Sequence, residues 1–528
     1  MSSSASPASK EVGAQPRERE QLEAPLEEYE RTSSTRPAFL LTFTEVKLLG
    51  IAGVGFLLDA YDLFIINPVA TMLQYRLYNG QHLPPHLEGF LKAGANIGSV
   101  IGQFLFGYLA DALGRKAVYG KELMLIIFAT ILCLTTPTGR LSPDSSLIYL
   151  TIFRILLGVG VGGDYPMSAT ITSDRANIRK RGTLLAYIFS NQGWGSFLGS
   201  LITIIVLECY RHTMDVEGKT SKVDGVWRII VGVSLVPAFG TLYQRLTLPE
   251  STRFKRTRDE ETSLEDLKKK NNSEEEGSVD KSETKVEQES EKETEKKAHI
   301  KEFIQYFSEW RHARHLIGTC VCWFLLDVAF YGINLNQNVV LQQIGYDGAT
   351  GTPWQKLFNV STGGIIITAL GFVPGYYASI FTIEILGRKW IQIQGFILAA
   401  LFLAILAAKF DSLSHTSFIV CFAFLQFFFN FGANTTTYCY PAELFPTKFK
   451  AFAHGLSAAA GKAGAIVSAL AFNQLSKDIG TPDVLWIFVG CCLAGAVVTV
   501  LCLPEVKGRD ADEIYRQEER EKRERQRL

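Results

Sequence analysis

Residues Leu147–Thr172 read LIYLTIFRILLGVGVGGDYPMSATIT and form a mostly apolar run that is long enough to cross a bilayer as a helix. The run contains an acid, Asp164, although an ionisable side chain at the centre of a membrane costs about 2.5–3.5 kcal/mol on insertion scales. Intramembrane acids indicate a functional site by default, and the neighbouring glycines allow a helix or a ligand to approach the backbone. The run predicts either a site for a small polar solute or a close-packed helix crossing in which the acid has a polar partner inside the protein.

Gly158, Gly160 and Gly163 also match the G-x-G-x-x-G pattern of dinucleotide-binding proteins. That pattern binds a pyrophosphate where it follows a β-strand and opens the helix of a βαβ unit. Here it lies inside an apolar run of membrane length, so we exclude the dinucleotide interpretation.

The 528-residue chain alternates apolar blocks with polar segments, and blocks of about 20 residues are typical of transmembrane helices. The pattern predicts an all-α membrane protein with twelve such helices. The expected spans are 48–70, 89–110, 119–136, 146–168, 183–206, 227–247, 313–335, 356–383, 390–408, 416–439, 451–473 and 484–503. The formal net charge is zero, with 53 basic and 53 acidic residues, which suggests no nucleic-acid partner.

Charge and composition divide the chain into five segments. Residues 1–45 are predicted to be a disordered tail without a signal peptide, and 249–311 a flexible charged linker. The linker separates an N-terminal half, 46–248, from a C-terminal half, 312–506, each with six helices, and 507–528 form a charged tail in which a short helix is expected. The bias of lysine and arginine in the short loops predicts that both termini and the linker lie in the cytosol.

The two halves repeat each other. Asp111-Ala-Leu-Gly-Arg-Lys116 recurs as Glu384-Ile-Leu-Gly-Arg-Lys389, and Leu248-Pro-Glu-Ser recurs as Leu503-Pro-Glu-Val. With this repeat the chain resembles the major facilitator superfamily, which implies two six-helix halves that rock around a site near the bilayer midplane. The resemblance also implies a cytosolic gate, besides simple anchoring of the basic loops, formed by Asp111, Arg115, Lys116, Glu384, Arg388 and Lys389.

Two further blocks narrow the family. Residues 162–169, Gly-Gly-Asp-Tyr-Pro-Met-Ser-Ala, resemble the G-G-D-Y-P-L-S-A signature of the proton-coupled inorganic phosphate symporters of fungi and plants, with Met167 in place of Leu. Residues 59–64, Asp-Ala-Tyr-Asp-Leu-Phe, match a second block of that family. The resemblance extends from about residue 46 to 510 and implies uptake of H2PO4⁻ with protons across the plasma membrane.

The same resemblance implies the roles of individual residues. Phosphate would be bound by Tyr165, Gln192, Trp323, Asp327, Tyr331, Asn434 and Lys462. Protons would pass through the carboxylates of Asp59, Asp62, Glu122 and Asp164. The implied substrates are phosphate and protons, without cofactor or metal, and arsenate is expected to compete because the two anions are chemically alike.

The residue types agree with these roles. Trp323, Asp327 and Tyr331 are spaced by four and share one helix face, which offers an indole N–H, a carboxyl and a phenol. An ionised aspartate beside an anion would repel it. We therefore expect Asp327 either to accept an O–H of phosphate or to bind phosphate while protonated, which would link proton binding to phosphate binding.

Other interpretations stay open at this stage. Trp323 also suits an interfacial anchor, Gln192 and Asn434 suit interhelical hydrogen bonds, and Lys462, like Arg154, suits the neutralisation of an acid. The whole chain also fits a facilitator for another small solute or a transporter-like phosphate sensor. A membrane enzyme or an ATP-driven pump is disfavoured, because the sequence contains no G-x-S-x-G, H-E-x-x-H or Walker A pattern.

Overall fold

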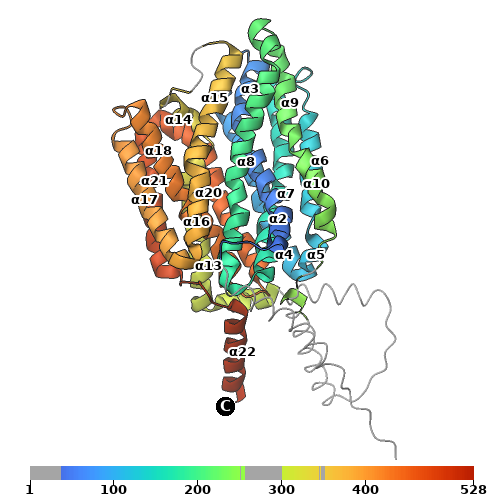
Figure 1. The fold of residues 1–528 in the computed structure, drawn as a ribbon, viewed down its shortest axis with the longest axis vertical. Helices are drawn as coiled ribbons and strands as arrows, with labels where there is room; N and C mark the ends of the chain where they lie inside the picture. The colour runs from blue at the N-terminus through green and yellow to red at the C-terminus, as the bar shows by residue number, and fades with distance from the viewer. Residues whose placement is uncertain are drawn as a thin grey trace, which may run out of the picture.

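The computed structural model is a bundle of long helices that run side by side (Figure 1). It describes residues 37–249, 251, 253–255, 258, 300–343, 345–346 and 351–527. Most of the expected N-terminal tail and charged linker therefore lie outside the described residues. Among the residues that are described, the regular secondary structure is helical and contains no strand.

Six crossings form the N-terminal half. They are α2 (Phe43–Phe64) with α3 (Ile66–Leu77), α4 (Pro85–Leu113), α5 (Arg115–Val118) with α6 (Lys121–Leu134), α7 (Pro143–Arg175), α8 (Arg181–Cys209), and α9 (Val223–Val233) with α10 (Leu235–Leu246). Five of them are apolar enough to be recognised as membrane spans by composition. The remaining one, α4, has 29 residues and packs along α7 and α20.

Six more crossings form the C-terminal half. They are α13 (Trp310–Asn334), α15 (Pro353–Ile367) with α16 (Val373–Leu386), α17 (Arg388–Ala408), α18 (His415–Asn430) with α19 (Ala433–Leu444), α20 (Lys450–Asp478) and α21 (Thr481–Cys502). The described residues thus confirm the twelve predicted crossings. A final helix, α22 (Ala511–Arg527), projects from one end of the bundle, where a short helix was expected (Figure 1). We call this end the α22 end and the opposite one the far end.

The Gly-Arg-Lys repeat is visible in the backbone. Gly114 ends α4 with a φ of +92°, and Gly387 ends α16 with a φ of +85°. Glycine adopts such positive φ values at little cost. Each glycine therefore turns the chain so that the next residue, Arg115 or Arg388, begins the following helix.

The glycines of Leu147–Thr172 hold α7 against α4. A Cβ atom on Gly158 would lie 2.1 Å from the carbonyl oxygen of Ala95, and one on Gly98 would lie 1.9 Å from that of Ile155. These distances leave no room for side chains, so the two backbones touch along this face. The close-packed crossing is therefore present, while the side chain of Asp164 turns to a partner on α10.

We expect Gly158→Ala to lower the melting temperature of the detergent-purified protein, because the new methyl group must push α4 away from α7. Overpacking of this kind costs about 1–3 kcal/mol. The measurement is thermal unfolding followed by fluorescence. The matched control is Gly490→Ala on α21, where an added Cβ meets nothing within 4 Å. Equal melting temperatures for the two variants would contradict the close contact.

Candidate solute-binding site

The seven residues expected to bind the solute surround one buried centre between the halves. Two come from the N-terminal half, on α7 and α8, and five from the C-terminal half, on α13, α19 and α20. Each has a relative exposure of 2% or less. The seven are Tyr165, Gln192, Trp323, Asp327, Tyr331, Asn434 and Lys462.

Lys462 is the cation of this centre. Its Nζ donates to the hydroxyl of Tyr331 at 2.6 Å and to that of Tyr165 at 3.4 Å, and it lies 4.4 Å and 4.9 Å from the centroids of their rings. Phenols from opposite halves thus share one ammonium group. Because its described hydrogen-bond partners are neutral, Lys462 can still form an ion pair with an anion.

Amide groups continue the centre on its other side. The Gln192 Oε1 accepts from the Asn434 Nδ2 at 3.1 Å and from the Tyr376 hydroxyl at 2.5 Å. Asn434 also donates to Tyr376 at 2.8 Å and to Asn430 at 2.7 Å. These bonds join the halves, as the interhelical interpretation of Gln192 and Asn434 expected. The sequence reasoning missed Tyr376, which lies in an apolar run with few distinguishing signals.

Trp323 and Asp327 complete the α13 face. The Trp323 ring packs beside Gly461, where a Cβ would lie 2.4 Å from the indole, and 6.4 Å from the Tyr165 ring. With 2% exposure, Trp323 is not an interfacial anchor. The Asp327 Oδ2 is buried without a hydrogen-bond partner, and Lys462 is the charged group that acts on it. An unpartnered buried carboxylate oxygen is costly, so this atom is suited to a ligand that brings a donor.

Asp59 and Asp62 of α2 resemble Asp327. Both are 1% exposed, and all four of their carboxylate oxygens are buried without a hydrogen-bond partner. Arg154 lies close by, but its guanidinium donates to the backbone carbonyl of Asp62, at 3.3 Å from each of two nitrogens. Its hydrogen bonds therefore reach the backbone, while its charge acts on the Asp62 carboxyl, in keeping with the expected neutralisation of an acid.

Glu122 and Asp164 are held by a cation that the sequence reasoning missed. Arg245 of α10 lies 2.7 Å from the Asp164 Oδ1 and 3.3 Å from the Glu122 Oε1, and all three side chains are inaccessible to solvent. Glu122 is thus not solvated at a span end. The available signal was Arg245, the arginine of the expected span 227–247 that lies away from the Arg228 end, because a buried cation needs an anionic partner.

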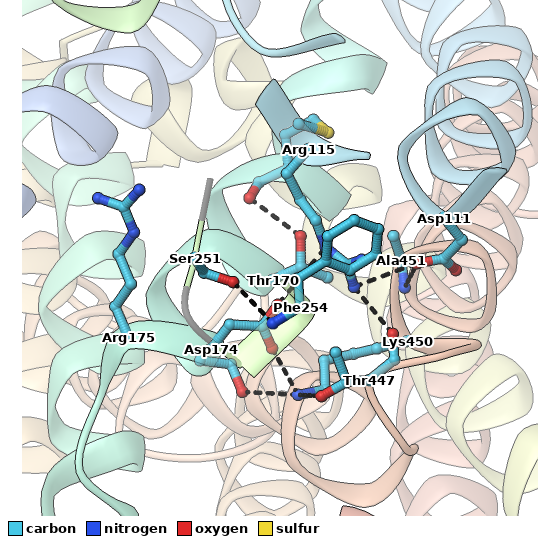
Figure 2. Close-up of polar contacts among 12 residues, drawn as sticks. Asp111, Arg115, Thr170, Asp174, Arg175, Ser251, Phe254, Thr447, Lys450 and Ala451 are labelled. Carbon is cyan, nitrogen blue, oxygen red and sulfur yellow. Dashed lines mark hydrogen bonds and ion pairs between the residues drawn. The ribbon is translucent and has the colours of Figure 1, made fainter. Parts of the chain in front are cut away.

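A second network closes the α22 end (Figure 2). Arg115 pairs with Asp111 at 3.2 Å and Asp174 at 3.4 Å, all in the N-terminal half. It also donates to the backbone carbonyl of Thr447, at 2.9 Å, across the halves. Lys450 crosses the same boundary to Asp174 at 2.9 Å. The acid–base pair that joins the halves is therefore Lys450–Asp174, while the motif acid Asp111 pairs within its own half.

Asp111 reaches the other half through the backbone. Its carboxylate accepts from the amides of Ala451 and Phe452 at 3.3 Å and 2.8 Å, in the first turn of α20. The first amides of a helix lack intrahelical acceptors and carry a partial positive charge, so an acid is favourable there. Asp111 therefore fastens the start of α20 to the N-terminal half.

The C-terminal motif forms a parallel network. Arg388 pairs with Glu384 at 2.8 Å and with Glu443 at 2.6 Å, and Glu384 accepts from the backbone amide of Thr183, across the halves, at 3.1 Å. Lys389 donates to the carbonyl of Val500 at 3.1 Å. Lys116 lies exposed at the surface.

The C-terminal helix also touches this region. Asp512 of α22 accepts from the backbone amide and the hydroxyl of Thr447 at 2.6 Å and 2.7 Å. Burial raises the pKa of the Asp512 carboxyl, but Lys450 and the bonds from Thr447 outweigh burial and hold the pKa below its ordinary value. Asp512 therefore stays ionised, and its stabilising effect is lost only as the pH falls through this lowered pKa.

The far end is closed as well. Asn67 donates to the carbonyl of Asn334 at 3.0 Å, and the Trp354 indole donates to the carbonyl of Leu207 at 2.6 Å, both across the halves. With both ends joined and its residues buried, the centre is occluded from either side.

Comparison with known proteins agrees with this architecture. Residues 48–517 match the family model described as "Sugar (and other) transporter". A Schizosaccharomyces pombe protein is 44% identical over 94% of this chain and 92% of its own, and the inorganic phosphate transporter PHO84 of Saccharomyces cerevisiae is 37% identical over 89% and 84%. The solved proton:xylose symporter XylE of the major facilitator superfamily superposes with a TM-score of 0.68 at 19% identity, covering 90% of this chain and 98% of XylE. The likeness to XylE confirms the major facilitator fold.

We expect Asp174→Asn to loosen the α22 end, because the amide removes the anion shared by Arg115 and Lys450. Breaking a buried ion pair costs about 3–5 kcal/mol. Hydrogen–deuterium exchange should then rise in peptides around 170–176 and 446–454. Peptides at the far end should not change. The matched control is Glu217→Gln, which removes an exposed pair with Lys219. Unchanged exchange in Asp174→Asn would contradict the role of this pair.

Proposed function

The chain belongs to the sugar (and other) transporter family, and from this premise we propose that it carries inorganic phosphate into the cell together with protons. It is a membrane transporter and not an enzyme. The names of its relatives favour phosphate, since PHO84 and the Neurospora crassa phosphate permease, which is 36% identical, align over most of their length. The proposed location is the plasma membrane, with the α22 end in the cytosol.

The observation that carries the proposal is that Lys462 and Asp327 lie in one buried centre, where the charge of Lys462 acts on the Asp327 carboxyl. Lys462 and the phenols beside it supply a positive charge and donors, and the Asp327 Oδ2 is an acceptor without a partner. Dihydrogen phosphate carries a negative charge, acceptor oxygens and O–H donors, so it can satisfy both sides at once. A neutral sugar brings no negative charge to the ammonium group.

The energetic cost of moving an anion against the membrane potential favours coupling to protons. Moving one H2PO4⁻ into a cell with a negative interior costs about 2.3 kcal/mol per 100 mV. One proton cancels this charge, and further protons are needed before the potential can drive uptake. Asp59, Asp62 and Asp327 are suited to carry them, because their oxygens include unpartnered acceptors. Asp164 and Glu122, which Arg245 already holds, would instead relay protons or respond to their movement.

Alternating access would use the two closed ends in turn. The network of Asp111, Arg115, Asp174 and Lys450 would part to release phosphate to the cytosol, and the contacts at the far end would part to admit it. The proposed cycle needs no cofactor, because the gradients supply the energy.

We expect purified protein in proteoliposomes to take up labelled phosphate faster at acidic than at neutral outside pH. A protonophore should abolish the difference, and arsenate should compete. Asp327→Asn should reduce uptake by at least about tenfold, which corresponds to ~1.4 kcal/mol. The matched control is Asp411→Asn at an exposed position. Uptake that depends neither on pH nor on Asp327 would contradict proton coupling, and binding without transport would favour a sensor.

We also expect Lys462→Gln to weaken equilibrium binding of labelled phosphate by about tenfold to a hundredfold, since a hydrogen bond to a charged group contributes about 1.5–3 kcal/mol. Tyr331→Phe removes a neutral donor and should weaken binding less. The control is Lys409→Gln, at an exposed lysine. Full affinity in Lys462→Gln would show that the anion binds elsewhere.

A further inference from the structure

Five aromatic rings lie on the α22 side of the phosphate centre, and we call them the aromatic plate: Phe56, Phe189, Trp323, Tyr438 and His454. Phe189, Tyr438 and His454 lie three, four and eight positions from a centre residue on the same helix, toward the helix end that carries the α22-end network, and Trp323 belongs to the centre itself. The plate therefore lies between the rest of the phosphate centre and that network.

The rings of the plate contact one another. Tyr438 stacks on Phe189 with ring centroids 4.7 Å apart and meets the edge of Phe56 at 5.1 Å. His454 contacts Tyr438 at 5.2 Å and Trp323 at 5.7 Å, both edge to face. A solute that leaves the centre toward the α22 end must pass between these rings.

The hydrogen bond of His454 fixes its tautomer. The Nε2 lies 3.2 Å from the backbone carbonyl of Tyr438, and a carbonyl can only accept, so Nε2 carries the proton. The Nδ1 is then a bare acceptor, and it is buried without a partner. The hydroxyl of Tyr438 is also buried without a partner, and both residues are 0% exposed.

Two unsatisfied polar groups in contacting rings call for a ligand, because buried polar groups are nearly always hydrogen-bonded. The Tyr438 hydroxyl can donate, and the His454 Nδ1 can only accept. H2PO4⁻ offers a P–O oxygen to the first and an O–H to the second. A fully deprotonated oxyanion such as sulfate has no proton to give to Nδ1.

We propose that Tyr438 and His454 form a second phosphate subsite on the cytosolic exit path. The subsite rests on the proposed function and is used after the α22 end opens. His454 precedes Lys462 by eight residues on the continuous helix α20, which is about 12 Å along the axis. Phosphate thus passes from the ammonium of Lys462 to a donor–acceptor pair that recognises its protonated form.

The charges around the subsite fit this transfer. Asp59 and Asp164 act electrostatically on Tyr438. Arg245 already pairs with Asp164, so Asp59 is the acid without a hydrogen-bonding partner that an arriving anion meets. A proton on Asp59 removes that repulsion, so protonation of Asp59 favours the arrival of phosphate at the subsite.

Three substitutions of His454 distinguish the roles of its two ring nitrogens. His454→Phe keeps a ring without acceptors, His454→Gln keeps a donor near the position of Nε2, and His454→Asn keeps an acceptor near the position of Nδ1. Tyr438→Phe removes only the hydroxyl. The control is His212→Gln, at an exposed histidine near the far end. Phosphate concentrations for half-maximal transport are measured from both sides, in right-side-out and inside-out membrane vesicles, after each variant is shown to be monodisperse.

We expect His454→Phe, His454→Gln and Tyr438→Phe to raise the half-saturating concentration from the cytosolic side by about tenfold, the effect of one hydrogen bond to an anion. The value from the outside should stay within about twofold, and His454→Asn should recover most of the cytosolic affinity. Equal effects on both sides, no effect on either, or identical Asn and Gln variants would overturn the subsite. Wild-type protein that carries no phosphate would overturn the proposed function and the subsite with it.

Discussion

A charge buried in a membrane protein must be compensated inside the protein, and Arg245 and Lys462, two of the buried cations, differ in how this is done. The charge of Arg245 is compensated by two acids, because it pairs with Asp164 and Glu122. These pairs bind α10 to α6 and α7. Lys462 is different, because its described partners are two phenols. Arg245 therefore stabilises the N-terminal half, whereas Lys462 has no ion pair among the described residues of the centre. The rest of the structure buries this second charge and closes the centre at both ends.

Backbone contacts keep that arrangement rigid. The glycine faces of α4 and α7 leave no space for side chains, and a Cβ on Gly455 of α20 would lie 2.4 Å from the carbonyl of Gln103 on α4. Helix α4 therefore lies between α7 of its own half and α20 of the other. In its last turn, Asp111 accepts hydrogen bonds from two amides in the first turn of α20. Close packing within and between the halves and a polar contact between them are thus built on one helix.

Much of this could be predicted from sequence. Apolar blocks and the Gly-Arg-Lys repeat predicted the twelve crossings and the two halves, and the motifs predicted seven residues that the fold brings to one centre. The roles of those residues stay predictions. Arg245 and Tyr376 were missed, because their partners lie on helices distant in the sequence and neither residue belongs to a recognisable block. The Lys450–Asp174 pair was missed for the same reason, since a loop motif does not reveal which cation crosses the halves.

The continuity of α20 has a further consequence. This single helix of 29 residues carries Lys450 at the closed end, His454 in the aromatic plate and Lys462 at the centre, over about 18 Å of its axis. Any tilt that draws Lys450 away from Asp174 also moves the ammonium of Lys462 within the bilayer. That displacement shifts positive charge through the transmembrane field even when no solute is bound. In the proposed cycle, membrane voltage would therefore act on the empty protein as well as on the anion that it carries.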